Sequence, residues 1–596
     1  MSSIPERSDV EPAYKWDLES IYASDGDWED AYADVEGRLE DLEAYEGRAT
    51  EDGETLLAVL QLSDELGREV EQVAAYARMR SDEDTSDQEY QALSSRAQSL
   101  ASRAESAASF IDPEIQSLDR DELDRMVAET EGLEQYEHYL DDVMRMKEHT
   151  RSTEVENVLA ELGEVTGASG EIYNLLSNAD MAFPTVEKPD GDAVEITQSN
   201  FTTLLKNPDR EFRREVYEGY FDEWTDVRNS VGAAYKNSVK ADVKLARARN
   251  YDTAREAAMD GPNVPAEVYD NLLETVRDNL DKLHRHAELK RESLGVDELR
   301  MWDLYMPMTD SESPDLDYDD AVDHVVEAVG ALGDDYQDRV REGIESRWID
   351  VYETADKRSG AYSSGTYDTQ PFILMNYQDD IASMYTLAHE LGHSLHSQLS
   401  SETQPYVYSG YEIFVAEVAS TVNEALLTDH LLETVDDPEF RRHVLNEYLE
   451  RFRSTLYRQT LFADFEHQAH QVVEENGALT PDRLDEIYGD LKREFYEPAA
   501  VDDRIEREWM RIPHFYRAYY VYQYSTGISA AVALADGILE EGEPAAERYL
   551  EFLQGGSREY PLELLETAGV DMSSPEPIQR ALDVYDDHLD EMADLV

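Results

Sequence analysis

Two histidines four residues apart are the first residues in the sequence whose spacing could support catalysis. His389 and His393 lie in the segment IASMYTLAHELGHSLHSQLS, where apolar residues recur at helical spacing. On a helix, both imidazoles project from one face and can reach one zinc ion at about 2.0–2.1 Å. Glu390 is rotated by about 100° from His389, so it can reach a water molecule beside the metal without being a ligand. This His-Glu-x-x-His pattern is the arrangement found in zinc peptidases.

A catalytic zinc site also needs a third protein ligand and an open position. The next predicted helix, from about Tyr411 to Leu427, carries Glu412, Glu417 and Glu424. Small residues would let this helix approach the histidine helix closely, namely Ala416, Ala419, Ser420 and Ala425. We predict that Glu417 is the third ligand and that Glu424, two turns further along the same face, orients a ligand imidazole. Glu412 is expected to be a solvated surface acid.

The surroundings of the motif argue against a chance match, which this composition would give in roughly 4 of 100 chains. Gly392 lies within the predicted helix, where a glycine costs about 1 kcal/mol and usually serves a close approach. The apolar run from Pro371 to Tyr377 precedes this helix and is predicted to be a strand, which could hold an extended peptide beside the metal. His396 lies one turn beyond His393 and is expected to pack or to support the site rather than to bind metal.

An aromatic segment near the C-terminus, IPHFYRAYYVYQYSTG, offers a second set of candidate groups. Its ring side chains are crowded together and are His514, Phe515, Tyr516, Tyr519, Tyr520, Tyr522 and Tyr524. One interpretation is an aromatic core whose tyrosine hydroxyls remain hydrogen-bonded. The other is that His514 and one or two hydroxyls stabilise the negative charge that develops on a carbonyl oxygen during peptide hydrolysis.

The elements that must position these groups are mainly helices. Helical periodicity covers four stretches, from about Asp27 to Asn178, Asn200 to Leu294, Ala321 to Arg347, and Asp379 to the end. The turn signal Pro189-Asp190-Gly191 predicts a hairpin within residues 182–198, and Arg300 to Met308 is predicted to be extended. We therefore expect a mostly α fold, with an N-terminal helical accessory region at 1–199 and a catalytic domain at 200–596.

The composition limits the partners of the protein. Asp and Glu number 134 against 52 Lys and Arg, giving a formal net charge of -82, and such a surface repels nucleic acid and anionic membranes. The acid is spread along the whole chain, which suggests adaptation to a salt-rich cytoplasm. The sequence has no cysteine, no signal-peptide pattern at its start and no run of 18 apolar residues. A soluble cytoplasmic protein is expected.

Five segments together resemble the M3 family of metallopeptidases, and specifically its oligoendopeptidase F branch. They are GAYSSG, PFILMNY, LAHELGHSLHS, FVAEVASTVNE and IPHFYRAYYVYQYSTG, and they occur in the order found in the family. The resemblance extends from about Asn200 to Tyr585 and, more weakly, over the N-terminal helices. It implies a large multi-helix body that encloses a deep substrate channel, with a zincin-like catalytic core and a small β-sheet along the site.

The resemblance also assigns roles to individual residues. It implies that one Zn²⁺ per chain is held by His389, His393 and Glu417, with Glu390 as the general base and Glu424 as a supporting acid. His514 matches a substrate-contacting histidine of the family. The transition-state tyrosines fall in the cluster that follows it, where Tyr520 and Tyr524 are favoured over Tyr516, Tyr519 and Tyr522.

The function implied is that of an intracellular zinc endopeptidase, which hydrolyses internal bonds of short, unstructured oligopeptides. Glu390 would take the proton of the attacking water and pass it to the leaving amine. We expect the peptide to pair its backbone with the strand near Phe372 to Tyr377. One alternative is a metallocarboxypeptidase of the same chemistry, which needs a fixed cation for the terminal carboxylate. Another is a non-catalytic helical binding protein with a chance motif.

Overall fold

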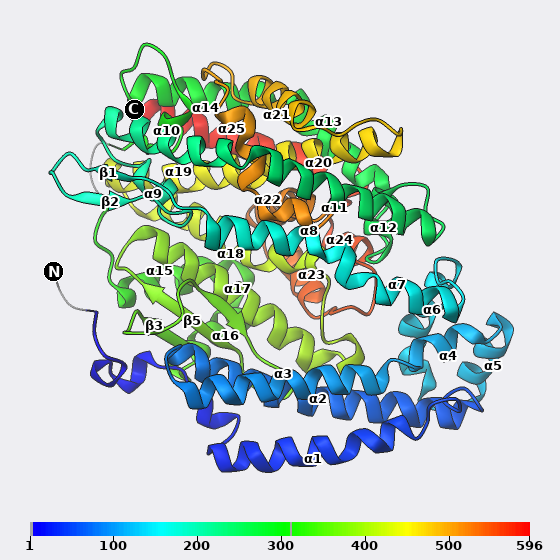
Figure 1. Ribbon diagram of the computed structural model, residues 1–596. Coiled ribbons are helices and arrows are strands. Elements are labelled where there is room, and N and C mark those ends of the chain that lie inside the picture. The colour runs from blue at the N-terminus through cyan, green and yellow to red at the C-terminus, as the bar shows by residue number, and fades with distance from the viewer. Residues whose placement is uncertain (1–3, 310–312) are drawn as a thin grey trace. The chain divides into compact units, whose positions relative to one another are not determined.

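The computed structural model describes residues 4–309 and 313–596, and most of them lie in helices (Figure 1). The chain forms two compact units, each assembled from separate stretches. Unit 1 comprises Met1–Glu148, Ser313–Glu433 and Leu534–Gly569, and unit 2 comprises His149–Glu312, Thr434–Ala533 and Val570–Val596. The mostly α fold expected from the helical periodicity is confirmed.

Unit 1 starts with a layer of helices. These are α1 (Asp25–Glu43), α2 (Gly53–Glu83), α3 (Gln88–Ala108), α4 (Ile111–Ser117), α5 (Arg120–Glu129) and α6 (Glu137–Arg145). The first three begin where the sequence supplies a cap, because Ser24, Asp52 and Asp87 each accept a hydrogen bond from a backbone N–H of the first turn. Trp28 of α1 is fully buried, and its indole nitrogen donates to the carbonyl of Val73 in α2 at 2.9 Å.

A small sheet and further helices complete unit 1. The strands are β3 (Ile349–Tyr352), β4 (Tyr362–Ser364) and β5 (Phe372–Tyr377), and the helices are α15 (Tyr318–Ala328), α16 (Asp334–Glu345), α17 (Ile381–Thr403), α18 (Ile413–Thr434), α23 (Glu543–Leu553) and α24 (Pro561–Ala568). The strand order is β3-β5-β4, with β5 parallel to β3 and antiparallel to β4. The strand predicted from the apolar run before the histidine helix is therefore confirmed as β5.

The place of β5 in the sheet shows that the expected pairing of a peptide with this strand is wrong. Phe372–Leu374 has β4 as a neighbour on one side, and β3 lies on the other. Beyond that point, the side-chain amide of Asn376 donates to the carbonyls of Arg358 and Gly360, in the segment that leads into β4. The physical reason lies in the sequence pattern itself, because a strand that is apolar on both faces is covered on both faces and belongs at the centre of a sheet. The two edge strands are β3 and β4, and each pairs with β5 alone among the described strands.

Unit 2 consists of helices and one hairpin. Its helices are α7 (Thr153–Glu161), α8 (Gly163–Leu175), α9 (Phe201–Leu204), α10 (Arg210–Asp226), α11 (Arg228–Ala248), α12 (Ala254–Asp260), α13 (Ala266–Asp278), α14 (Leu280–Ser293), α19 (Pro438–Arg451), α20 (Arg458–Glu474), α21 (Pro481–Phe495) and α25 (Glu576–Leu595). Helix α22 (Tyr522–Glu541) contributes residues to both units. The hairpin joins β1 (Thr185–Glu187) to β2 (Ala193–Glu195) in antiparallel register around the Pro-Asp-Gly turn.

The extended conformation predicted for Arg300 to Met308 is wrong, because the segment contains a turn of 3-10 helix at Met301–Asp303. Asp303 is fully buried and accepts hydrogen bonds from the guanidinium groups of Arg210 and Arg213. Its second oxygen also accepts from the backbone N–H of Arg300 at 3.0 Å. The helical turn places this carboxylate between two arginines. The sequence around Asp303 could not predict the contact, because the arginines lie about ninety positions away in the chain.

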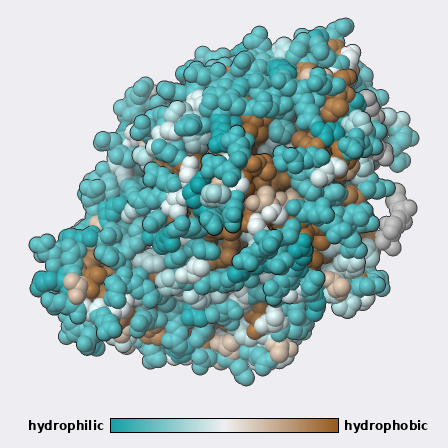
Figure 2. Space-filling model, turned by 180° about the vertical axis from the view of Figure 1, so that it is seen from behind, coloured by the Kyte–Doolittle hydropathy of each residue, from teal (hydrophilic) through white to brown (hydrophobic). Residues whose placement is uncertain are grey.

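The surface is largely polar. Figure 2 shows the face of the molecule opposite to that in Figure 1, and hydrophilic residues predominate on it. Within residues 4–309 and 313–596, no helix has the length and apolar character needed to cross a membrane.

Candidate active site

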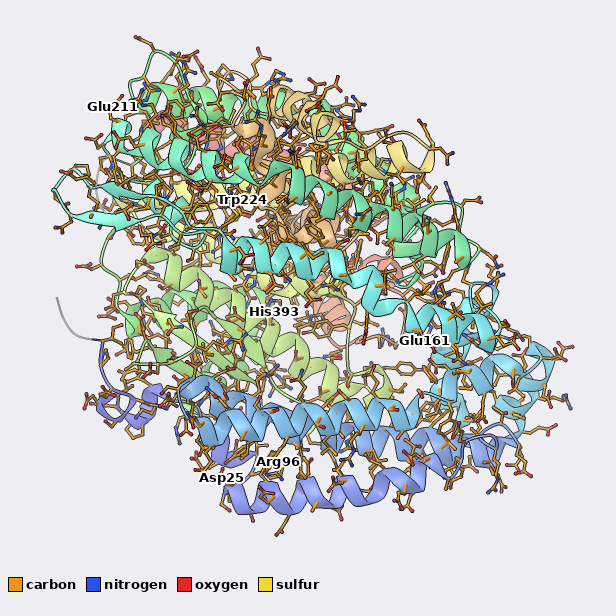
Figure 3. The ribbon with its side chains drawn as sticks, in the orientation of Figure 1. Asp25, Arg96, Glu161, Glu211, Trp224 and His393 are labelled. Carbon is orange, nitrogen blue, oxygen red and sulfur yellow. The ribbon has the colours of Figure 1, made fainter. Side chains whose placement is uncertain are left out.

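Helices α17 and α18 carry the candidate metal ligands and touch at Gly392. Helix α17 begins at its cap Asp380, whose side chain accepts from the backbone N–H of Ser383 at 2.7 Å. A Cβ added at Gly392 would lie 2.6 Å from the Cα of Ser420 and 2.7 Å from the carbonyl oxygen of Ala419. The close approach of two backbones therefore requires glycine at this position. His393, labelled in Figure 3, follows directly on α17.

The side chains of His389, His393 and Glu417 form one group. The Nε2 atoms of the two histidines are 3.2 Å apart, and Oε2 of Glu417 lies 3.6 Å from the first and 3.8 Å from the second. A tetrahedral metal with bonds of about 2.0–2.1 Å separates its ligand atoms by roughly 3.3 Å, so these atoms are spaced as the ligands of one ion. The three side chains are 19% to 31% exposed, which leaves the group open to solvent.

Glu424 supports the group through His389. The Nδ1 atom of His389 lies 2.8 Å from Oε1 of Glu424, so Nδ1–H donates to the carboxylate and Nε2 keeps its lone pair for a metal. Burial lowers the pKa of His389, but the hydrogen bond to Glu424 and the charges of nearby carboxylates outweigh burial, and the pKa is raised. Burial and the neighbouring His389 lower the pKa of His393 to about 3, against a smaller opposing contribution from the backbone of Ala416.

Glu390 lies beside the group without belonging to it. Its side chain is buried, and burial raises the pKa of Glu390 to about 7. A smaller contribution from the backbone of Ser363, in strand β4, opposes this rise in the pKa of Glu390. The Oγ atoms of Ser363 and Ser394 lie 2.8 Å apart, which ties β4 to α17. Strand β4 thus runs past Glu390 within unit 1.

The remaining acid and histidine near the motif have other surroundings. His396 is 1% exposed and stacks on Tyr411, with ring centroids 3.7 Å apart, and burial lowers its pKa to about 3. Glu412 is exposed. Among the described residues, the group with metal-ligand spacing contains neither of them, nor Glu424.

His514 belongs to a cluster in unit 2, on the short helix Pro513–Tyr516. Its ring lies parallel to that of Tyr520 at 6.1 Å and edge-on to that of Tyr524 at 6.0 Å, and the two tyrosine rings are 5.5 Å apart. All three side chains are partly exposed. The metal-ligand group belongs to unit 1.

The other tyrosines of the segment are turned into the interior of unit 2. Tyr519 and Tyr522 are 2% and 1% exposed, so neither can meet a substrate. Tyr516 stacks on Tyr173 with ring centroids 4.5 Å apart, and its hydroxyl is buried. Both interpretations of the aromatic segment therefore apply, because one part of it forms core and another part surrounds His514.

Three features of the site escaped the sequence analysis. Ser363 lies in a three-residue strand, and its segment GAYSSG contributed to the family resemblance, but the sequence analysis gave this residue no role. The contact of His393 with the backbone of Ala416 depends on the crossing of two helices. Arg517 is exposed, and its guanidinium lies 4.0 Å from the centre of the Tyr520 ring. The position of Arg517 in the sequence, between His514 and Tyr520, was the one signal that could have identified it as a residue of the cluster.

A helical fold with a His-Glu-x-x-His helix and a carboxylate from the next helix is that of a metal-dependent peptidase. The sequence matches the model of Peptidase family M3 over residues 203–584 and the model of Oligopeptidase F over residues 114–183. The chain belongs to peptidase family M3, in its oligoendopeptidase F branch, as the five sequence segments predicted.

Relatives match over nearly the whole chain. Oligopeptidase PepF of Bacillus subtilis (strain 168) is 41% identical over 596 residues, which is 100% of this chain and 89% of that protein. Group B oligopeptidase PepB of Streptococcus agalactiae serotype III (strain NEM316) is 38% identical, covering 99% of this chain and 98% of that one. The crystal structure of oligoendopeptidase-F from Enterococcus faecium superposes with a TM-score of 0.75 at 34% identity, covering 96% of this chain and 99% of that one. These matches confirm that the protein is a metallopeptidase.

Proposed function

We propose that this metallopeptidase is a zinc endopeptidase that cuts internal bonds of short, unstructured peptides. The observation that carries the proposal is the placement of Glu390 beside the group of His389, His393 and Glu417, on a helix that the Ser363–Ser394 contact holds against strand β4. A water molecule, a general base and a peptide backbone can therefore meet within unit 1.

Two imidazole nitrogens and one carboxylate oxygen form the donor set of a catalytic zinc site, and their spacing fits one ion. His389 and His393 would hold the metal from one helix, and Glu417 would hold it from the other. When bound, zinc supplies a Lewis acid that polarises the scissile carbonyl and makes water more acidic. The hydrogen bond that His389 Nδ1–H donates to Glu424 keeps the imidazole in the orientation that a ligand needs.

Glu390 is the candidate general base. Its carboxylate lies on the same helix as two ligands but outside the ligand group, so it is free to accept a proton from the attacking water. It then returns that proton to the leaving amine. The 2.8 Å contact between the Oγ atoms of Ser363 and Ser394 holds β4 against the helix that carries Glu390.

The substrate is proposed to bind as an added strand on β4. This strand has β5 on one side and no described strand on the other, and an extended peptide can use the free side for backbone hydrogen bonds. Backbone pairing of this kind does not depend on the side chains of the peptide, so it suits an enzyme that cuts peptides of varied sequence. A folded protein does not offer a free extended backbone, so native proteins should be spared.

We infer further that His514, Tyr520 and Tyr524 stabilise the oxyanion and line the channel that the family resemblance implies. Their mutual contacts and their partial exposure support this role, because oxyanion donors must be held in place and still reach the substrate. The match of the M3 model to residues 203–584 supports a catalytic domain at 200–596 and an accessory region at 1–199. The acidic composition supports action in a salt-rich cytoplasm.

The test uses a ten-residue quenched peptide blocked at both ends, with products identified by mass spectrometry. An endopeptidase cuts it, whereas a carboxypeptidase leaves it intact. Cleavage should stop with a chelator and return with zinc. Casein and a folded globular protein, at equal molarity and high salt, should be cut much more slowly. Equal rates on casein and on the short peptide would indicate an open cleft rather than a channel. If the blocked peptide stayed intact, the proposal of an endopeptidase would be wrong.

A further inference from the structure

Helices α7 and α8, with the residue between them, expose a row of large apolar side chains along the segment. Among the residues that the structure describes, nine large hydrophobic side chains are exposed, and six of them lie on this one segment. They are Val155, Val158, Leu162, Val165, Ile172 and Leu175, and they are 39% to 69% exposed. Two of the other three are Ile4 and Val596, near the chain ends. An apolar patch on so acidic a protein is costly to leave in water, so it marks a binding surface.

The charged residues of α7 and α8 are all acids, and one of them, Glu156, pairs with Arg249 at 2.9 Å. Four exposed glutamates accompany the row on the same two helices, and they are Glu154, Glu161, Glu164 and Glu171. Glu161, at the end of α7, is labelled in Figure 3. No lysine, arginine or histidine occurs between residues 153 and 176. We call the six apolar residues and these four glutamates the acid-rimmed face. Its chemistry is complementary to a ligand that carries both apolar and cationic side chains.

The acid-rimmed face lies near the His514 cluster within unit 2. The opposite side of α8 packs on the short helix that carries His514, where the rings of Tyr173 and Tyr516 stack. A Cβ at Gly170 would lie 3.8 Å from the Cβ of Tyr516. The outer side of α8 is therefore about one helix diameter, roughly 10 Å, from this segment. An extended peptide covers that distance in roughly three residues.

We propose that the acid-rimmed face binds the outer residues of the peptide substrate and selects apolar and cationic side chains there. This inference rests on the proposed function and adds the substrate class. When a peptide bond of the substrate is held near His514, the substrate residues three or four positions away would lie on α8. Their apolar side chains would cover the row, and a lysine or arginine would meet the glutamates.

A second copy of the chain fits this surface less well. Symmetric pairing would place the four glutamates of one copy against the same four of the other, with no cation on either helix to separate them. The net charge of -82 opposes such contact further. A cationic, apolar peptide meets neither obstacle.

The experiment compares three quenched peptides with identical central residues and different outer residues: leucine with lysine, leucine with glutamate, and serine with lysine. The main variant is V165Q/I172Q/L175Q, whose positions are exposed and whose new residues favour helix. A second variant, E164Q/E171Q, removes charge alone. The matched control is L539Q, an exposed leucine on α22. Each is assayed for kcat/KM, and each is also combined with E390Q for binding of the labelled peptides by fluorescence anisotropy.

The wild-type protein should prefer the leucine-lysine peptide to each of the others by roughly tenfold, which corresponds to about 1.4 kcal/mol. V165Q/I172Q/L175Q should lose the preference for leucine, E164Q/E171Q should lose the preference for lysine, and L539Q should keep both. The lysine preference should shrink as salt rises from about 0.1 M to about 1 M.

Unchanged preferences in the two α8 variants would overturn the inference. So would a change of sedimentation from dimer to monomer in V165Q/I172Q/L175Q without any effect on the peptides, since the face would then bind a second copy. A failure of the proposed function is recognised separately, because no peptide would then be cut while the anisotropy measurements would still report on the face.

Discussion

The Nδ1 atom of His389 lies 2.8 Å from Oε1 of Glu424. This hydrogen bond joins α17 to α18 through a carboxylate that is not a member of the ligand group. We expect Glu424→Gln to weaken metal affinity by about 10- to 100-fold, because the amide no longer fixes the tautomer and orientation of His389. Metal affinity is measured by competition with a chelator. Glu412→Gln, at an exposed residue directly before the same helix, serves as the control and should bind metal normally. Equal affinities in the two variants would contradict the role of Glu424.

Substitution at Gly392 tests the close approach of α17 and α18. Gly392→Ala places a methyl group where the Cα of Ser420 is only 2.6 Å away, and overpacking of this kind costs about 1–3 kcal/mol. The helices must separate, so both the free energy of unfolding and the bound metal should decrease. Gly37→Ala on α1 meets no atom within 4 Å and should be neutral or slightly stabilising. Urea denaturation and metal analysis on both variants provide the comparison.

The separate roles of Glu390 and the ligands predict distinct defects. Glu390→Gln should retain the metal and lose nearly all turnover, since the general base is not a ligand. Glu417→Ala and His393→Ala should lose metal as well as activity. Metal content by mass spectrometry and kcat on a short peptide distinguish the two classes. Complete loss of metal in Glu390→Gln, or a rate close to that of the wild-type protein, would show that the assignment is wrong.

A buried carboxyl group in unit 2 predicts a pH dependence of stability. Glu466 accepts a hydrogen bond from the backbone N–H of Tyr519, its other oxygen is buried, and burial raises its pKa to about 8. A carboxyl group whose pKa is raised by folding stabilises the fold fully below its unfolded pKa of about 4.3, and this contribution is lost as pH rises through the folded pKa. The free energy of unfolding of the wild-type protein should therefore fall relative to that of Glu466→Gln as pH rises from about 4.5 to about 8, and the difference should then level off.

The measurement is urea denaturation of both proteins across this pH range. His470, whose Nε2 lies 3.3 Å from Oδ2 of Asp242, also faces Glu466 but is present in both proteins, so the difference reports mainly on Glu466. Parallel curves for the two proteins would mean that Glu466 is ionised in the folded state at neutral pH.

The net charge of -82 predicts that salt stabilises the protein. The Debye length falls from about 30 Å at 0.01 M to about 3 Å at 1 M, so repulsion among surface carboxylates is screened. The melting temperature and the activity should rise steeply from about 0.05 M to about 2 M KCl. A melting temperature that stays constant over this range would rule out adaptation to salt.

The sequence by itself determined the local features of this protein. Helical periodicity placed His389 and His393 on one face and Glu390 beside it, because the rotation per residue fixes such relations along a single helix. The apolar run at Phe372–Tyr377 indicated a buried strand for the same local reason. The family resemblance rested on five short segments, and it was sufficient to identify the class of enzyme.

Only the tertiary structure decided which residues meet across elements. It placed β5 at the centre of the sheet and left β4 at the edge beside Glu390, and it curled Met301–Asp303 around a buried carboxylate. It also turned Tyr519 and Tyr522 inward and gathered Tyr520 and Tyr524 around His514. Each outcome depends on contacts between positions far apart in the chain. Periodicity reports which face of an element is buried, but the partner of that face is chosen by packing and hydrogen bonding in three dimensions.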